Sequence, residues 1–380
     1  MSLAPQRAAA LPRIKRLRLS STLTGYIARQ FFVRFMAFFF GLVGVILLVS
    51  LVDLLDRMAN KQDVGLGLVL QLSLLKLPYL SQEALPFTVL FAGLATFWRL
   101  TRSNELVVAR AAGISVWQFL LPVLAVSLAI GIFAVTVMNP LAAILLGRFE
   151  QLEARYLRHG TSMFAVSKTG LWLRQADDVG QSVIHAQRVT PESMTLHEVI
   201  VFRYQGEDRF AGRIDAPRAE LRDGHWRLYE ALVTTPGAAG QFSERLDIET
   251  DLTPEKIQES FAPPETISFW SLPGFIEILE EAGFSGQRHR LQLHRLLALP
   301  VLFAAMVLLA ATFSLRPQRR GRIGLIILCG VGAGFLLYFV SNFVFALGLS
   351  AKIPVVLAGW TPAGVSLMLG TAMLLHLEDG

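Results

Sequence analysis

Charged residues are scarce in this chain of 380 residues. Asp, Glu, Lys and Arg make up 17% of it, against about a quarter of a typical soluble domain, and 53% of the residues are hydrophobic. The single cysteine, Cys329, excludes an intrachain disulfide. The sequence also lacks a GxxxxGK[ST] loop, an HExxH motif and a GxSxG turn, so catalysis by this chain has little support. These absences exclude a cytosolic enzyme, a secreted disulfide scaffold and a disordered tail.

The chain instead has six stretches that carry no charge between their bounding residues. These stretches lie between residues 34 and 53, 83 and 99, 110 and 148, 295 and 316, 322 and 352, and 352 and 378. Each reaches or approaches the ~20 residues that a helix needs to cross about 30 Å of hydrocarbon. The sequence therefore predicts an α-helical polytopic membrane protein with six transmembrane helices.

The segment between the third and fourth predicted spans has a different character. Residues 145–290 hold 16 basic and 22 acidic side chains, whereas the rest of the chain holds 19 basic and 7 acidic ones. Hydrophobic and polar residues alternate here in short runs separated by turn signals. These runs include Gly170–Arg174, Ser182–Gln187, Glu198–Tyr204 and His225–Tyr229. The pattern predicts an inserted all-β domain, either an antiparallel sandwich or a rolled sheet.

Four segments follow from these patterns. They are a basic N-terminal arm at 1–24, transmembrane helices one to three at 25–140 with a cytoplasmic helix at about 103–113, a β domain with flanking helices at 141–288, and helices four to six at 289–380. We expect the third span to close at Asn139-Pro140 and the chain to continue from it as a helix into water over Leu141–Gly160. The second span, which contains Pro78 and Pro86, is predicted to be kinked or only partly exposed to lipid.

Basic residues predict the orientation. The N-terminal arm and the loops at 99–110 and 316–322 are all basic, and in a six-span chain they fall on the same side of the membrane. The positive-inside rule makes that side the cytoplasm. We therefore expect both termini to be cytoplasmic and the β domain to lie outside.

The loop between the second and third spans is the first candidate site. Ser103 or Asn104 can cap a short helix, Glu105 is favourable in its first turn, and Gly113 supplies a flexible exit. One reading is an ordinary amphipathic loop helix. The other is a coupling helix that docks on a cytoplasmic ATPase. The spacing Glu-x-x-x-Ala-x-x-Ala-Gly over 105–113 is similar to the coupling motif of bacterial ABC-transporter permeases.

Arginines on the predicted outer side form the second candidate site. Arg148 and Arg155 follow the third span, and Arg295 enters the fourth, where the positive-inside rule predicts few basic residues. Their guanidinium forks would suit a phosphorylated substrate in the outer leaflet. The alternative is salt bridging within the soluble domain.

Several short segments, in this order, resemble the lipopolysaccharide export permeases, the paired subunits LptF and LptG. The segments are Leu23–Gln30, Leu51–Asp56, Leu85-Pro86, Ser103–Val108, Ala112-Gly113, Gly170–Trp172, Pro300 and Ala310–Phe313. The resemblance runs from about Thr24 to Leu375. Ser103–Val108 and Gly170–Trp172 look more like LptG than LptF.

The resemblance implies a permease half of an LptF–LptG heterodimer in the bacterial inner membrane, with a jellyroll-like periplasmic domain. It also implies two copies of the ATPase LptB, which use ATP and Mg²⁺, and a periplasmic bridge that begins with LptC and LptA. The substrate would be lipopolysaccharide, extracted from the outer leaflet. No cofactor, metal or nucleic acid is implied for this chain.

Carried over to this sequence, the resemblance implies roles for particular residues. Glu105, Ala109, Arg110 and Gly113 would belong to the ATPase-docking helix. Asp53 and Arg57 match a charged end of the first span that faces the substrate cavity, although Ser50 stands where some members have a basic residue. Three phenylalanines, spaced four residues apart, would line the acyl-chain side of the fifth span or simply face lipid. They are Phe335, Phe339 and Phe343.

Two other classes of function stay open from the residues alone. A membrane-anchored structural or sensory protein would use the outer domain to bind a protein partner and would need no ATPase. A small-solute secondary transporter would use Lys76 and Glu83, seven residues apart on one helical face, as an ion pair. Such transporters are often built from inverted repeats, which the sequence does not reveal.

Overall fold

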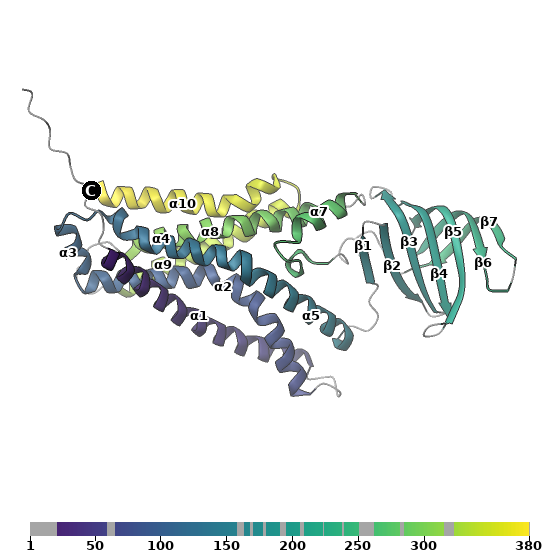
Figure 1. Cartoon of the computed structure of the whole chain (residues 1–380), viewed down its shortest axis with the longest axis horizontal. Helices are drawn as coiled ribbons and strands as arrows, with labels where there is room; N and C mark the ends of the chain where they lie inside the picture. Colours follow the sequence, from purple (N-terminus) through teal and green to yellow (C-terminus); the bar gives the residue numbers. More distant parts are fainter. Residues whose placement is uncertain are drawn as a thin grey trace, which may run out of the picture.

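The structure of the chain is a computed structural model, and it describes residues 21–58, 65–157, 163–167, 170–177, 180–190, 195–205, 209–222, 224–237, 239–250, 262–281, 285–314 and 323–379. A bundle of helices carries a β-sheet at one end (Figure 1). Most of the predicted N-terminal arm lies outside the described residues, as does the basic loop at 316–322.

Long helices build the bundle. Before the sheet, the elements are α1 (Ser21–Met58), α2 (Leu66–Arg102), α3 (Glu105–Ala111), α4 (Val116–Phe133), the π-helical turn η1 (Ala134–Met138) and α5 (Asn139–Leu157). After it come the 3-10 turn η2 (Pro264–Thr266), α7 (Leu272–Glu281), α8 (Gln287–Ser314), α9 (Ile323–Leu349) and α10 (Val355–Asp379). Six helical segments among the described residues are long and apolar enough to span a membrane, with α4, η1 and most of α5 forming one of them. The six-helix prediction is confirmed.

The predicted helical continuation beyond Asn139-Pro140 is confirmed, because α5 extends to Leu157. A proline has no N–H to give to the carbonyl four residues earlier, which here belongs to Thr136. The π-helical turn falls at this place, and Trp270 Nε1 donates a hydrogen bond to the Thr136 carbonyl at 3.1 Å. The proline in the sequence predicts the lost backbone hydrogen bond, but the donor that replaces it is a side chain 134 residues away.

Two of the six spans form the centre of the bundle. In their most apolar windows, α2 and α8 have 56% and 67% of their residues buried, whereas α1 and α9 have 11% each. Pro78 and Pro86 lie inside α2 without ending it, and this span is only partly exposed, as expected. The outer positions of α1 and α9 therefore leave two long apolar faces uncovered.

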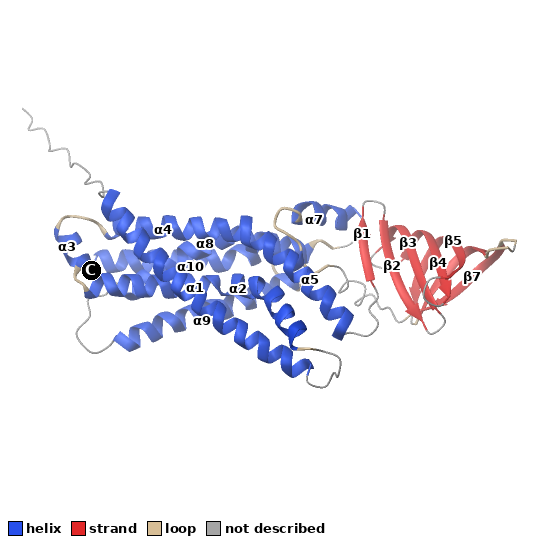
Figure 2. Cartoon of the chain, turned by 60° about the horizontal axis from the view of Figure 1, so that its bottom comes forward, coloured by secondary structure: helices blue, strands red, loops and turns tan. Residues whose placement is uncertain are grey.

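Seven antiparallel strands form a single sheet whose spatial order follows the chain. The strands are β1 (Met163–Ser167), β2 (Gly170–Asp177), β3 (Gly180–Thr190), β4 (Thr195–Gln205), β5 (Arg209–Arg222), β6 (His225–Thr234) and β7 (Gln241–Glu249). Figure 2 shows the strands of this sheet grouped beyond the end of the helices. One sheet rather than two favours the rolled alternative over the sandwich. The four strand runs read from the sequence lie in β2, β3, β4 and β6.

Strand β5 is not one of the four named runs, and it contains Pro217 as well as several charged residues. The pairing skips Pro217 on both sides, since Ala216 and Arg218 pair with β4 while Asp215 and Arg218 pair with β6. Opposite the skips, Glu198 and Glu230 have positive φ angles of 53° and 52°. Pro217 has no N–H to donate, and neither neighbouring ladder pairs at this residue, although the register continues past it on both sides.

One face of the sheet is apolar. Its buried members include Leu173, Ile184, Val201 and Ile214, which lie side by side across four strands. Leu279 of α7 belongs to the same cluster, whereas Leu272 and Ile276 of α7 pack in a cluster with α8. Helix α7 therefore joins the core of the sheet to the core of the bundle.

Candidate functional site

Helix α3 lies at the end of the bundle that is farthest from the sheet (Figure 1). Asn104 occupies its N-cap position, but its side chain makes no capping hydrogen bond, so the predicted side-chain cap is wrong. Asn104 instead adopts a left-handed backbone with φ 58°, which asparagine tolerates better than most residues. Gly113 leaves the helix at φ 83°, a value that favours glycine. Two left-handed residues thus turn α3 between α2 and α4.

Glu105 is tied to its surroundings at the start of α3. The Ser103 hydroxyl donates to Glu105 Oε1 at 2.8 Å, and the Tyr26 hydroxyl of α1 donates to the same atom at 3.3 Å. Leu106, next along the helix, is buried in the bundle core. Helix α3 is therefore attached to the first span as well as to its sequence neighbours.

The opposite face of α3 is uncovered and partly apolar. Val107 and Val108 are 59% and 67% exposed, Arg110 is also exposed, and Ala109 is half-buried. The two valines were not singled out from the sequence. Helical periodicity could have indicated them, because a buried Leu106 places the next two positions on the outer side of a short helix.

Asp53 and Arg57 lie near the other end of α1. They form an i, i+4 ion pair with Arg57 Nη2 and Asp53 Oδ2 3.0 Å apart, and about half of each side chain is exposed. Ser50, one turn earlier, is buried. Both side chains face solvent, and their opposite charges cancel.

The predicted outer arginines occupy different surroundings. Arg148 is exposed on α5 and forms no ion pair with any residue that the structure describes. Arg155 lies on α5 too, but its side chain is outside the described part of the chain. Arg295 lies within the bundle, 2.7 Å from Glu83 Oε2, and its guanidinium lies over the Phe345 ring at 5.2 Å. The structure therefore separates the three arginines.

Lys76 and Glu83 are not paired with each other. Glu83 is the partner of Arg295, and Lys76 Nζ lies 5.3 Å from the centre of the Phe149 ring. The ion pair that the secondary-transport alternative requires is thus replaced by a pair between α2 and α8.

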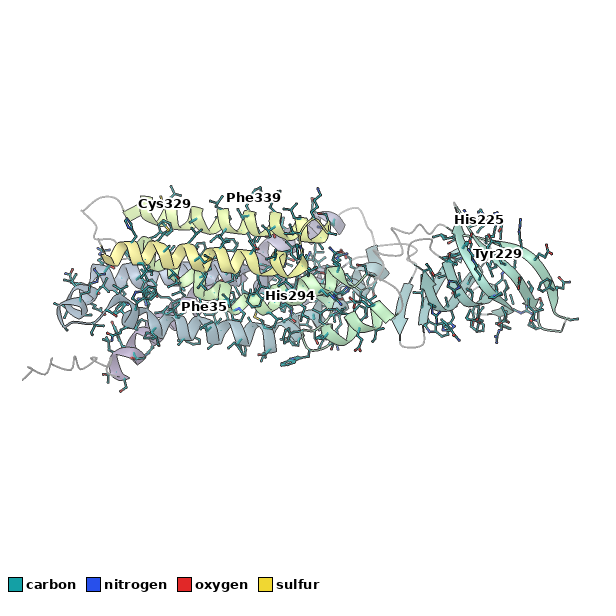
Figure 3. The ribbon with its side chains drawn as sticks, turned by 90° about the horizontal axis from the view of Figure 1, so that it is seen from above. Phe35, His225, Tyr229, His294, Cys329 and Phe339 are labelled. Atoms are coloured by element: carbon teal, nitrogen blue, oxygen red, sulfur yellow. The ribbon has the colours of Figure 1, made fainter. Side chains whose placement is uncertain are left out.

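Phe335, Phe339 and Phe343 form an aromatic row on the outer face of α9. They are 58%, 71% and 60% exposed, and Figure 3 shows Phe339 on the side of α9 that faces away from the other helices. Phe335 also contacts Phe87 of α2, with ring centres 5.2 Å apart. The row is available to lipid or to another protein along most of its length.

Among the described residues, no three His, Cys, Asp or Glu side chains cluster in a way that could hold a metal ion. The candidate groups lie in three separate places. The short helix α3 is at one end of the bundle, the uncovered apolar faces of α1 and α9 run along its sides, and charged residues lie toward the sheet.

Comparison with known proteins agrees with this arrangement. The family model "Lipopolysaccharide export system permease LptF/LptG" matches residues 25–376. The lipopolysaccharide export system permease protein LptG of Escherichia coli (strain K12) is 24% identical over 360 residues, which cover 92% of this chain and 97% of that protein. The protein of the same name from Haemophilus influenzae is 23% identical over 361 residues, covering 90% and 95%. Because the family model extends from α1 to α10, this chain belongs to the LptF/LptG family of lipopolysaccharide export system permeases.

Proposed function

We propose that this multi-pass inner-membrane protein is one permease half of an ATP-driven exporter, which extracts lipopolysaccharide from the inner membrane and passes it to a periplasmic bridge. The observation that carries the proposal is the separation of α3 from the sheet by the full length of the six spans. A machine that receives energy on one side of a membrane and delivers its cargo on the other needs such a separation. In this orientation both termini and α3 are cytoplasmic and the sheet is periplasmic.

The energy must come from a partner. Moving acyl chains out of a bilayer costs about 0.8 kcal/mol per CH₂ group before any compensation. The sequence has no phosphate-binding loop of its own. We therefore assign ATP and Mg²⁺ to an LptB-like cytoplasmic ATPase, present in two copies, one for each permease half.

We assign the ATPase contact to α3. Glu105 is fixed by hydrogen bonds, while Val107, Val108 and Arg110 point away from the bundle. An exposed apolar pair beside an arginine is a suitable surface for a groove on another protein. The small side chain of Ala109 leaves room for close approach of a partner. Gly113 lets the chain turn back into the membrane.

The uncovered faces of α1 and α9 support a second membrane subunit, which we propose to be LptF-like. Both helices have few buried residues, so a partner can cover them without displacing an existing contact. The lipid would enter between these helices of the two subunits. The aromatic row on α9 would then contact acyl chains, which need an apolar wall.

The phosphate groups of the lipid would meet basic residues toward the sheet. Arg148 is exposed and free of described ion pairs, which makes it the best-supported phosphate contact. Arg57 and Arg295 can bind phosphate only if they first leave their ion-pair partners, Asp53 and Glu83. Arg155 is proposed as a phosphate contact from the sequence alone. From there the lipid would pass to LptC- and LptA-like proteins of the bridge.

Photocrosslinking tests the proposal. A photoreactive residue at Phe339 should form lipopolysaccharide adducts in cells, and the yield should depend on ATP hydrolysis by the partner. Phe133 on α4 is a matched control, since it is also aromatic, lies toward the sheet end of its helix and is 56% exposed. Equal adducts at both positions would indicate nonspecific contact with the leaflet and contradict the proposal, as would an epitope tag in residues 170–250 that is found in the cytosol.

A further inference from the structure

Basic side chains of α1 and α2 lie together at the end of the bundle that carries α3. Arg34 of α1 and Arg99 of α2 are close enough to repel each other electrostatically. The two helices pack together at this level, since Phe31 of α1 and Phe97 of α2 belong to the same buried core. Neither arginine has a role in the function proposed above.

The charges of these two arginines are not balanced by the residues around them. Neither Arg34 nor Arg99 forms an ion pair with a residue that the structure describes. Glu105 of α3 attracts Arg34, but its described hydrogen bonds come from Ser103 and Tyr26. One carboxylate therefore faces two guanidinium groups.

The neighbouring parts of the chain add positive charge rather than removing it. Residues 1–34 hold seven basic and no acidic side chains. Residues 315–322, which follow the end of α8 beside α2, hold four basic and no acidic ones. Even with Glu378 and Asp379 near the end of α10, this end of the bundle keeps a large excess of positive charge.

Two aromatic side chains lie at the same level. Trp98 is half-buried beside Arg99, and the guanidinium of Arg102 lies over its ring, 5.3 Å from the centre. Tyr26, two turns before Arg34 on α1, is 39% exposed. Tryptophan and tyrosine are enriched at the level of lipid headgroups, because their rings are apolar and carry one polar group.

We propose that Arg34 and Arg99 bind the phosphate group of an anionic phospholipid between α1 and α2. A phosphate diester carries one negative charge and two free oxygens, which match the fork of a guanidinium group. The described hydrogen bonds of Arg34 leave from Nη1, to the backbone and side chain of Gln30, so Nη2 and Nε remain for the phosphate. Basic pockets between membrane helices on the cytoplasmic side are typical sites for such headgroups.

This lipid is not the proposed cargo. In the proposed orientation the site faces the cytoplasmic leaflet, whereas the lipopolysaccharide is extracted from the other leaflet. Binding of a phospholipid in detergent does not depend on that orientation, so the inference and the proposed function can fail separately.

A specific site must be distinguished from the weak attraction of any surface arginine to anionic lipid. Arg29 is the matched control for this purpose. It is exposed on α1, five residues before Arg34, which places it on another side of the same helix. Arg29→Gln and Arg34→Gln change the net charge equally at the same end of the span.

Native mass spectrometry of the full chain in detergent tests the inference. The chain should bind dioleoylphosphatidylglycerol about tenfold more tightly than dioleoylphosphatidylcholine, whose phosphate charge is cancelled by choline. Arg99→Gln and Arg34→Gln should each weaken phosphatidylglycerol binding about tenfold, because each removes a charged hydrogen-bond donor. Arg29→Gln should leave it unchanged.

Equal weakening by all three variants would indicate general electrostatic attraction and overturn the inference, as would equal binding of the two lipids. If Arg34→Gln does not fold, Arg99→Gln decides, because Arg99 is exposed. An excess of inorganic phosphate identifies the source of the anion. Unchanged phosphatidylglycerol binding supports a lipid headgroup, whereas displacement would make a soluble phosphate the ligand and overturn the assignment to lipid.

Discussion

Glu83 on α2 and Arg295 on α8 are 212 residues apart in the sequence and form an ion pair of 2.7 Å. The two helices are the most buried spans of the bundle. Phe345 of α9 lies against the same guanidinium, so three helices meet at one charge. A pair in this position is costly to break on one side only, because the remaining charge stays in a poorly hydrated place.

The pair gives the first prediction. Glu83→Gln or Arg295→Gln should each lower stability by about 1–3 kcal/mol, less than the loss for a fully buried pair because about a third of each side chain is exposed. The double variant should be more stable than the sum of the single losses implies. Thermal unfolding in detergent, analysed as a double-mutant cycle, measures this coupling. Strictly additive losses would show that the two charges do not interact.

The second prediction concerns the exposed face of α3. Val108→Asp should abolish co-purification with the ATPase subunit, because it places a charge in the proposed apolar contact. Val108→Thr is the matched control, since it keeps the shape without adding a charge. Full co-purification of the Asp variant would locate the ATPase contact elsewhere.

Glu105→Ala gives a third, separable prediction. The change removes the acceptor for Ser103 and Tyr26 and should weaken both ATPase co-purification and the stimulation of ATP hydrolysis. Tyr26→Phe removes only the hydrogen bond to α1, so it should spare binding and reduce stimulation. Unchanged binding and coupling in Glu105→Ala would remove the docking role of this residue.

The fourth prediction tests the crossing of α4 and α8. A Cβ atom at Gly131 would lie 2.5 Å from the Cα of Pro300, a backbone atom that cannot move aside cheaply. Gly131→Ala should therefore destabilise the bundle by about 1–3 kcal/mol. Gly44→Ala is the control, because nothing lies within 4 Å of a Cβ atom there. Equal melting temperatures for the two variants would show that the helices can separate without cost.

The fifth prediction concerns acid stability of the sheet. Burial by itself would raise the pKa of Glu220, and hydrogen bonds from Arg222 and Tyr229 oppose this effect. Together with the charge of Arg218, they hold the pKa below the ordinary 4.5. A carboxylate with a lowered folded-state pKa stabilises the fold above its unfolded pKa, and this contribution is lost as the pH falls through the folded value.

Glu220→Gln should accordingly melt at a lower temperature than the unchanged protein at pH 7, with a difference that narrows below pH 4.5. Melting curves of the sheet followed by circular dichroism between pH 7 and pH 3 measure it. Glu244→Gln, at an exposed residue of β7 that joins no described ion pair, should show no such narrowing. A difference that is constant with pH would assign the loss to packing rather than ionisation.

The spans and most strands could be predicted because their signals are local. A stretch without charge predicts a membrane helix regardless of what it packs against, and alternation predicts a strand regardless of its neighbour. Alternation also covers β5, but the place of Pro217 in it depends on the neighbouring strands, since neither ladder pairs at that residue. The helical continuation of the third span is also a local signal, whereas the hydrogen bond that Trp270, far along the chain, donates next to the proline is not.

The sequence by itself determined that this is a six-span protein with an inserted β domain, and its short motifs indicated the family. Hydrophobicity, charge and periodicity are properties of single segments, so they can be determined from the sequence without the tertiary structure. Only the tertiary structure decided that Arg295 pairs with Glu83 rather than standing free, and that Val107 and Val108 form the outer face of α3. Each of these depends on which helices pack together, because the strength of a charge or a hydrogen bond is set by the neighbours that exclude water from it.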